Sequence, residues 1–249
     1  MSVLLDTAGG VATITLDSPH NRNALSRQLM TELSAHLAAA GRDPAVRAVL
    51  LRSSGRVFCS GADLGEARQA MTSEAPRALV ALQRQIATLP RPVVVELAGP
   101  VRAGGLGLVG AADVVIAAAS VTFALTEVRL GLAPSAISLS LLEKLTPRAA
   151  ADVFLSGRTF DAAEAAAIGL VTRAVPDDEL PAAVAATLAE MVQGSRQGLA
   201  ETKRLLTAAL VDRIDRDGDA AAERSAELFA TPEAQRAMQA FLTRAKPPG

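Results

Sequence analysis

The sequence has very little of several chemically useful residues. It contains one cysteine, Cys59, and two histidines, His20 and His36, among 249 residues. A single cysteine excludes an intrachain disulfide and a cysteine-cluster zinc site, and it favours a reducing, cytoplasmic compartment. Neither histidine has a second plausible ligand nearby, which excludes a histidine-rich metal site. Tyrosine and tryptophan are absent. Their absence excludes phenolic acid–base chemistry and the aromatic platforms that stack single-stranded nucleic acid.

A basic excess is also missing, because 25 basic residues face 26 acidic ones and the net charge is −1. This balance argues against nucleic acid or a membrane surface as partner. No basic region precedes the first apolar stretch, so a secretory signal is not expected. The most apolar region, 103–126, contains Asp113 and several glycines, which suit a packed core better than a membrane span. Half of the residues are hydrophobic, which is enough to bury a sizeable core.

The hydrophobic pattern predicts strands that alternate with helices up to about residue 175, followed by helices alone. Gly9 and Gly10 separate two short apolar runs, which is typical of a β-hairpin. Ser26 and Asp161 stand where helix N-caps are expected. The predicted strands are 3–6, 11–17, 46–52, 92–97, 114–118 and 170–175, and the predicted helices are 27–40, 75–89, 147–155, 161–168, 177–192 and several beyond 195. Continuous apolar strands indicate a mostly parallel sheet covered on both faces, which is an α/β fold.

Two glycine-containing loops follow predicted strands. One is Phe58-Cys59-Ser60-Gly61-Ala62-Asp63-Leu64, and the other is Arg102-Ala103-Gly104-Gly105-Leu106-Gly107. Small residues at a strand–helix junction let a ligand approach backbone N–H groups, and a helix N-terminus favours negative charge. The second loop lacks the P-loop signature and the spaced acidic residue of a dinucleotide site. Each loop alone is equally compatible with an ordinary tight turn.

A third segment, Phe123–Gly131, holds Glu127 in apolar surroundings, where a carboxylate needs a partner or a chemical role. By itself it also fits an exposed carboxylate paired with Arg129.

Taken together, five segments in order resemble the crotonase superfamily, the enoyl-CoA hydratase/isomerase family. FCSGADL is similar to its F-x-x-G-A-D-L loop, and AGPVRAGGLGLVGAADV is similar to its N-G-x-x-x-G-G-G segment. FALTEVRLGLAPS is similar to its F-x-x-P-E-x-x-x-G-x-x-P segment. PHNRNALS and RTFDAAEAAAIGLVTRAV resemble its Asn-Ala-Leu and A-x-E-A-x-x-x-G-L-V segments. The resemblance covers essentially the whole chain.

This resemblance implies a spiral of ββα turns in residues 1–195 and a helical region in 196–249 that builds a homo-oligomer, either a trimer or a dimer of trimers. It implies an acyl-CoA thioester as substrate, with no metal or redox cofactor. The backbone N–H groups of Ala62 and Gly104 would form an oxyanion hole, and Glu127 would be the catalytic acid/base. The residues implied to contact the substrate or its CoA part are Arg22, Ala24, Ser60, Gly61, Asp63 and Leu64. Lys246 is a further candidate, toward the CoA of a neighbouring subunit.

The sequence departs from the family pattern where hydratases usually carry a second glutamate. That position is Gly107, so Glu127 is the one glutamate retained, and Ala103 replaces the first glycine of the triplet. Three readings remain open: an enoyl-CoA hydratase in which Glu127 handles both water and proton, a Δ3–Δ2 enoyl-CoA isomerase with the same single base, and a weakly active acyl-CoA-binding homologue.

Other reactive side chains have structural interpretations. We expect Glu66 to be a solvated helix residue near the mouth of the site. Glu96 interrupts a predicted central strand and is expected to pair with a basic residue such as Arg102. With no histidine nearby in sequence, Cys59 is interpreted as a packed small residue rather than a nucleophile.

Overall fold

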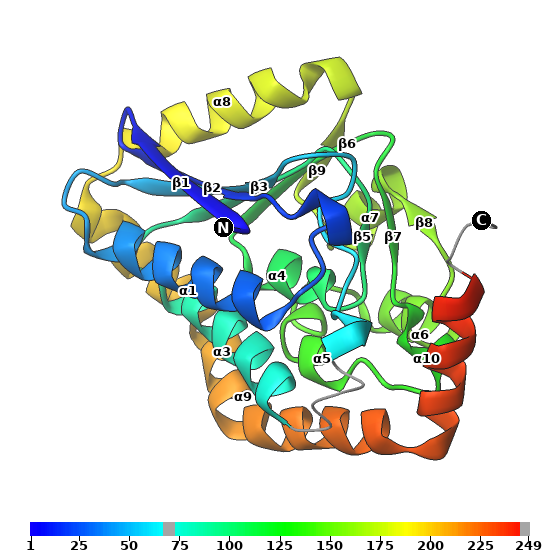
Figure 1. Cartoon of the computed structure of the whole chain (residues 1–249). Coiled ribbons are helices and arrows are strands. Elements are labelled where there is room, and N and C mark those ends of the chain that lie inside the picture. Colours follow the sequence, from blue (N-terminus) through cyan, green and yellow to red (C-terminus); the bar gives the residue numbers. More distant parts are fainter. Residues whose placement is uncertain (67–72, 245–249) are drawn as a thin grey trace.

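The computed structural model describes residues 1–66 and 73–244, and Figure 1 shows how its layers are arranged. A six-stranded sheet has the order β1-β2-β3-β4-β6-β9. Its strands are β1 (Val3–Ala8), β2 (Val11–Leu16), β3 (Ala48–Ser53), β4 (Val93–Leu97), β6 (Val114–Ala118) and β9 (Arg173–Val175). Only the β1–β2 pair is antiparallel among these six strands, so the predicted α/β class with a mostly parallel sheet is confirmed.

The hairpin at the start of this sheet has the turn that its sequence predicts. Gly9 and Gly10 have φ values of +58° and +83°. Two consecutive residues with positive φ make the turn whose twist matches that of paired strands, and glycine adopts this conformation without a steric penalty.

Successive turns of the chain repeat one pattern. Each turn gives a strand to the large sheet, then a short strand or an isolated bridge to a second sheet, and then a helix. The second sheet contains β5 (Val101–Arg102), β7 (Thr122–Ala124) and β8 (Phe160–Asp161). Isolated parallel bridges Leu25↔Ala62 and Cys59↔Val101 extend this stack to earlier turns. Equivalent loops of neighbouring turns therefore lie side by side, in a spiral of ββα units.

Helices cover both faces of the large sheet. In Figure 1, α8 crosses one face, and α1 and α4 lie on the other side, with α3 and α9 further out. The helices are α1 (Arg27–Arg42), α3 (Glu74–Thr88), α4 (Gly105–Ala111), α5 (Ser135–Leu141), α6 (Pro147–Ser156), α7 (Ala162–Ala167), α8 (Leu180–Val192), α9 (Arg196–Ala230) and α10 (Pro232–Arg244), with 3-10 turns at η1 (Pro19–Asn21), η2 (Thr126–Leu130) and η3 (Asp177–Glu179).

Two helix starts confirm the caps expected from sequence. The Ser26 hydroxyl accepts a hydrogen bond from the Leu29 N–H, and Asp161 accepts one from the Glu164 N–H. Each side chain satisfies a backbone donor that has no partner within its helix.

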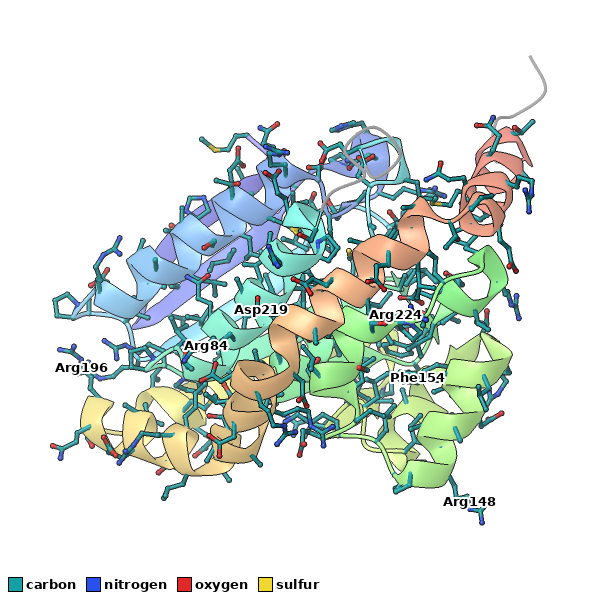
Figure 2. All side chains as sticks on the ribbon, turned by 90° about the horizontal axis from the view of Figure 1, so that it is seen from below. Arg84, Arg148, Phe154, Arg196, Asp219 and Arg224 are labelled. Atoms are coloured by element: carbon teal, nitrogen blue, oxygen red, sulfur yellow. The ribbon has the colours of Figure 1, made fainter. Side chains whose placement is uncertain are left out.

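The long helix α9 packs diagonally across α3 and α5, and Figure 2 shows this seam from below. Arg84 of α3 forms a bidentate ion pair with Asp215 of α9, with its Nε 2.6 Å from Oδ1. At the other end of the seam, the buried Lys203 ammonium lies 2.7 Å from the Asp113 carboxylate and donates to the carbonyls of Ile86 and Arg91. A buried charge needs this degree of pairing, so Lys203 fixes the position of α9 against the sheet.

Candidate active site

A cavity of about 1160 Å³ lies where the repeated loops meet the helices α1, α3, α9 and α10. The loops supply Ala62, Gly104 and Glu127 to its wall. A cavity of this size is large enough for a substantial organic ligand. The structure therefore brings the three principal candidate residues from distant parts of the sequence into one site.

Ala62 and Gly104 occupy equivalent places in successive turns of the spiral, because each follows a strand of the second sheet or its bridge. A Cβ built on Gly104 would lie 3.7 Å from the Ala62 nitrogen, so the two backbone groups are close neighbours. Within residues 1–66 and 73–244, neither N–H donates to a protein acceptor. Two adjacent free donors at the start of a helix form a suitable place for a developing negative charge.

The residues next to these donors have unusual backbone conformations. Gly61 has φ +96° and Ala103 has φ +46°. A Cβ on Gly61 would come within 2.9 Å of the Ala103 Cβ, so glycine is required at position 61 on steric as well as conformational grounds. Gly61 is buried behind the donors and is not among the cavity-lining residues, which differs from its expected contact with substrate. Alanine at positive φ stores strain beside the donors, as is common at functional sites.

Glu127 lies on η2 and lines the cavity. Its Oε2 is buried and has no hydrogen-bond partner among the described residues. Burial in apolar surroundings raises the pKa of Glu127 to about 7, and the residue's own backbone N–H opposes this shift weakly. No ion pair joins Glu127 to Arg129 in the part of the chain that the structure describes. Glu127 is thus divided between acid and base forms near neutral pH, which suits proton transfer.

The position of the missing second glutamate is closed. Gly107 lies within α4 and does not line the cavity. A Cβ there would be 2.8 Å from Ile137 Cγ2 and 3.3 Å from Gln83 Cδ. Gln83 is held in place by the Ser140 hydroxyl, which donates to its Oε1 at 2.7 Å. Packed side chains therefore occupy the place where a second glutamate would extend.

The segment that precedes α1 lies along the first loop. The Ser60 N–H donates to the Arg22 carbonyl at 3.1 Å, and the Leu25 N–H donates to the Gly61 carbonyl at 2.8 Å. Arg22, Ala24 and Ser60 all line the cavity, with the Arg22 side chain exposed. These contacts bring the segment to the cavity wall, and its expected contact with substrate stays a prediction.

Asn23 is a structural residue that the sequence analysis did not single out. Its amide accepts from the Ser18 N–H at 2.7 Å and donates to the Val57 carbonyl at 2.9 Å, and the residue itself has φ +54°. Asn23 thereby ties the segment before α1 to the strand exit before Ala62. Asparagine tolerates the left-handed conformation better than most residues, which is the signal that could have identified it.

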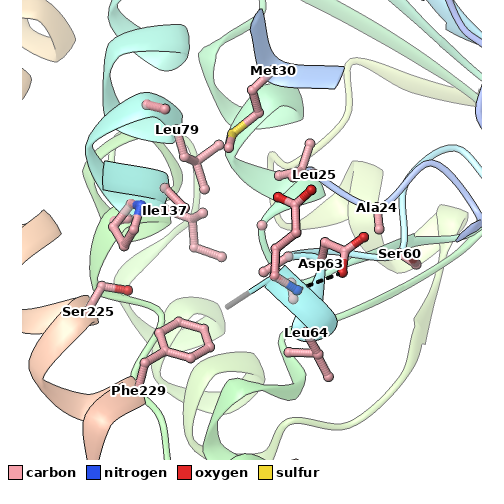
Figure 3. Close-up of a pocket in the computed structure, with 18 of the residues that line it drawn as sticks. Ala24, Leu25, Met30, Ser60, Asp63, Leu64, Leu79, Ile137, Ser225 and Phe229 are labelled. Carbon is pink, nitrogen blue, oxygen red and sulfur yellow. Dashed lines mark hydrogen bonds between the residues drawn. The ribbon is translucent and has the colours of Figure 1, made fainter. Parts of the chain in front are cut away.

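Asp63 and Leu64 also line the cavity. The Asp63 carboxylate accepts hydrogen bonds from the N–H groups of Gly65 and Glu66, at 3.0 Å and 3.2 Å. Figure 3 shows Asp63 beside Ser60 and Leu64 on this wall. Asp63 thus holds the backbone of the loop that follows it, at the edge of the site.

The remaining candidates have structural surroundings. The Glu66 carboxylate accepts from the Arg27 N–H at the start of α1, and its side chain is exposed at the mouth of the cavity. The expected Glu96–Arg102 pair is wrong, because Arg102 donates to Thr122 instead. Glu96 lies outside the cavity. Cys59 is fully buried, and burial raises the pKa of its thiol to about 12, which confirms a packing role. Lys246 lies outside the described residues.

Part of the cavity wall comes from a distant region that the motifs did not indicate. Ser225 and Phe229 of α9 face Ile137 and Leu79 across the cavity in Figure 3. Phe241 of α10 also lines the cavity. The sequence analysis did not indicate these three residues, since nothing local marks which side of a helix meets a ligand.

The described residues lack two other kinds of feature. Residues 1–66 and 73–244 contain no group of three or more His, Cys, Asp or Glu side chains placed to hold a metal ion. None of the helices described is both long and apolar enough to cross a membrane.

Comparisons with known proteins agree with this architecture. The sequence profile of the enoyl-CoA hydratase/isomerase family matches residues 6–248. A Mycobacterium bovis protein named as a probable enoyl-CoA hydratase is 37% identical over 234 residues, which cover 88% of this chain and 81% of that protein. The crystal structure of an enoyl-CoA hydratase from Mycobacterium avium is 48% identical with a TM-score of 0.91, covering 99% of this chain and 98% of that one.

A more distant structure, an enoyl-CoA hydratase/isomerase from Pseudoalteromonas atlantica, is 28% identical with a TM-score of 0.89 and full coverage of both chains. The spiral of ββα turns with its appended helices is therefore shared well beyond the regions that form the cavity. Fold, motif order and cavity position all lead to the same assignment: the chain belongs to the enoyl-CoA hydratase/isomerase family of the crotonase superfamily.

Proposed function

We propose that the protein is an enoyl-CoA hydratase that converts a 2-enoyl-CoA to a 3-hydroxyacyl-CoA, with Glu127 as its main acid and base. The observation that carries this proposal is a single buried carboxyl with pKa about 7 in the same cavity as two free, adjacent backbone donors. The names of the relatives support the same reaction class.

In the proposed reaction the thioester oxygen accepts hydrogen bonds from the N–H groups of Ala62 and Gly104. The Glu127 carboxylate removes a proton from water as the oxygen of that water bonds to C3. The double bond's electron pair moves to give the thioester enolate, and the protonated Glu127 then delivers its proton to C2. The net result is the addition of one water molecule across the double bond, and Glu127 returns to its carboxylate form. Addition of both groups to one face of the double bond allows one carboxyl to serve both carbons.

The expected contributions are consistent with a working enzyme. Losing one oxyanion donor typically lowers the rate by about 10²–10³, and losing a positioned proton carrier lowers it by about 10²–10⁴. Burial of Glu127 lowers the local dielectric and thereby strengthens both electrostatic effects.

For the CoA part of the substrate, we propose the wall formed by Arg22, Ala24, Ser60, Asp63 and Leu64. Arg22 is the cation on this wall, and its exposed guanidinium suits a phosphate group at the rim. The small Ala24 and Ser60 leave room for a narrow chain to pass between the rim and the donors.

One observation favours a second candidate, the Δ3–Δ2 enoyl-CoA isomerase. Ile137 and Gln83 close the place where a second carboxylate could help to hold water. Isomerisation needs no water, because one base moves a proton from C2 to C4. The same Glu127 and the same oxyanion donors would serve that reaction.

Incubation of the purified protein with 2-enoyl-CoA and 3-enoyl-CoA thioesters separates these candidates. The expected result is hydration of the 2-enoyl substrate. It is measured as loss of the conjugated thioester absorbance and by the mass of the product. Conversion of only the 3-enoyl substrate to its 2-enoyl isomer would replace the hydratase assignment by the isomerase. Binding without turnover of either would indicate a weakly active acyl-CoA-binding homologue.

We also propose that the chain forms a homo-oligomer. Leu205 and Leu206 of α9 are each 77% exposed, and Leu155 of α6 is 76% exposed. Leucines this exposed favour burial against another molecule, and the family resemblance points to a second copy of this chain. Sedimentation at micromolar concentration tests this, and a stable monomer would contradict it.

A further inference from the structure

A group of three arginines lies where the end of α1 meets the start of α9. In Figure 1 these two helix ends lie together at the left edge, and Figure 2 shows Arg196, the first residue of α9, on the same side of the molecule. The other two members are Arg47, which precedes β3, and Arg91, which precedes β4. None of the three lines the cavity that contains Glu127, so the group belongs to a different part of the surface.

Hydrogen bonds bring the guanidinium groups of Arg47 and Arg91 to one turn of the chain. Arg91 donates from Nη2 to the Asp43 carbonyl at 3.3 Å, and from Nη1 to the Pro90 carbonyl at 2.6 Å. Arg47 donates from Nη1 to the Pro44 carbonyl at 3.2 Å. Since Asp43 and Pro44 are consecutive residues, the two cations converge on the turn that ends α1.

The start of α9 approaches this turn from the other side. A Cβ built on Gly10 would lie 3.7 Å from Arg47 Cγ and 3.7 Å from Cγ1 of Val192, the last residue of α8. The helix α9 begins soon after Val192, and its Lys203 donates to the Arg91 carbonyl at 3.0 Å. These contacts hold the first turns of α9 beside both arginines.

Arg91 is a buried cation with an incomplete set of partners. It is 2% exposed, and its Nε has no hydrogen-bond partner among the described residues. Burial lowers the pKa of the Arg91 guanidinium, and the charges of Arg196 and Arg47 lower it further, while Asp43 opposes the shift. Within residues 1–66 and 73–244, none of the three arginines forms an ion pair with an acidic side chain. The arginines and Asp43 together therefore leave an excess of two positive charges around a buried guanidinium.

Such an excess needs a negative charge from outside these residues. A buried charge is costly unless a counter-charge accompanies it, and the positive end of the α9 dipole adds to the imbalance. A bound anion would supply the missing charge. The oxygens of a phosphate group point in different directions, so one phosphate can accept from several guanidinium groups at once, whereas a carboxylate pairs side by side with one of them.

We propose that Arg47, Arg91 and Arg196 form a binding site for a small phosphate-bearing anion, outside the cavity. Arg91 is the floor of this site, and the exposed Arg196 side chain covers the anion from the solvent side. The bound phosphate group joins the end of α1 to the start of α9 and thereby stabilises the attachment of α9 to the sheet. This inference does not depend on the reaction proposed for Glu127.

Calorimetric titration with inorganic phosphate, at an ionic strength held constant with sodium chloride, tests the site directly. The native protein should bind one phosphate per chain. Arg196→Ala should weaken this binding by about tenfold or more, because it removes a charge-assisted hydrogen bond, and its exposed position leaves folding intact. Arg148→Ala is the matched control, since it removes an exposed arginine of α6 that lies far from Arg196 in Figure 2, and it should leave the affinity unchanged.

Thermal unfolding adds a signature that a purely structural arginine would not give. Without phosphate and at low ionic strength, Arg196→Ala should raise the midpoint, because it relieves repulsion with Arg91. In saturating phosphate the order should reverse, because the native protein binds the ligand more tightly and is stabilised more by it.

Four outcomes would overturn the proposal. They are no phosphate binding by the native protein, equal affinity in Arg196→Ala, the same loss in Arg148→Ala, and an order of midpoints that phosphate does not change. A further variant, Arg22→Ala, separates this site from the rim of the cavity. Loss of phosphate binding in Arg22→Ala, with Arg196→Ala unaffected, would assign the phosphate to that rim and would equally contradict the proposal.

Discussion

Replacing Glu127 by glutamine removes the proposed catalytic carboxyl with almost no change in shape. The amide can neither accept a proton from water nor deliver one to C2, so turnover should fall by about 10²–10⁴. Binding of a saturated acyl-CoA should persist, because the cavity keeps its volume and both backbone donors. The expected signature is therefore a loss in kcat with little change in thioester affinity.

The same substitution should stabilise the protein in a pH-dependent way. Burial raises the pKa of Glu127 from 4.5 to about 7, so the folded protein binds a proton more tightly than the unfolded chain. The stabilising contribution of the proton bound to Glu127 is fully present below pH 4.5 and is lost as the pH rises through about 7. Each unit of pKa shift corresponds to about 1.4 kcal/mol. At pH 8 the buried carboxylate therefore lowers the free energy of unfolding by about 3 kcal/mol, and glutamine removes this loss.

Urea denaturation of the two proteins at several pH values measures this difference. The stability advantage of Glu127→Gln should be small at pH 5 and should grow to about 3 kcal/mol at pH 8. Glu96→Gln is the matched control, because Glu96 is also partly buried with a pKa raised by burial but lies outside the cavity. Near-full activity in Glu127→Gln would refute its role as proton carrier, and a pH-independent stability difference would refute the burial argument.

Four further predictions follow from the same geometry. The kcat/KM for hydration should rise with pH through an apparent pKa near 7, set by Glu127, in initial-rate measurements. Ala103→Gly should raise the unfolding free energy in urea by about 1 kcal/mol, since glycine carries no penalty at φ +46°. Gly107→Glu should lower the thermal midpoint because of the contact with Ile137, and adding Ile137→Ala should restore part of it. Lys203→Met should cost about 3 kcal/mol of stability by urea denaturation, because Asp113, which is only 13% exposed, loses its cation and keeps only the Val93 N–H as a donor; Asp113→Asn in the same chain should recover part.

Most of the fold could be predicted because its signals are local. The glycine pair at 9–10, the caps Ser26 and Asp161 and the apolar strands each act over a few residues, and each appears where the sequence predicts it. The second sheet was not predicted element by element. Its strands β5, β7 and β8 contain only two or three residues each, too few to show a period.

The candidate site could be predicted only in part, because motif order identifies loops but not what packs behind them. Ala62, Gly104 and Glu127 were expected together, and they line one cavity. The closure of the Gly107 position depends on Ile137, thirty residues away in sequence, and no local pattern relates the two. The roles of these residues and the division of the chain at residue 195 stay predictions.

The contribution of α9 and α10 to the cavity wall has a consequence for the order in which the protein is made. The loops with Ala62, Gly104 and Glu127 are complete before Ser225, Phe229 and Phe241 are synthesised. A nascent chain that has reached residue 195 therefore has the three groups proposed to act in the reaction but lacks one wall of the apolar cavity. Binding of the acyl part of a ligand would require the last helices, so a substrate present during synthesis would favour the finished protein over its folding intermediates.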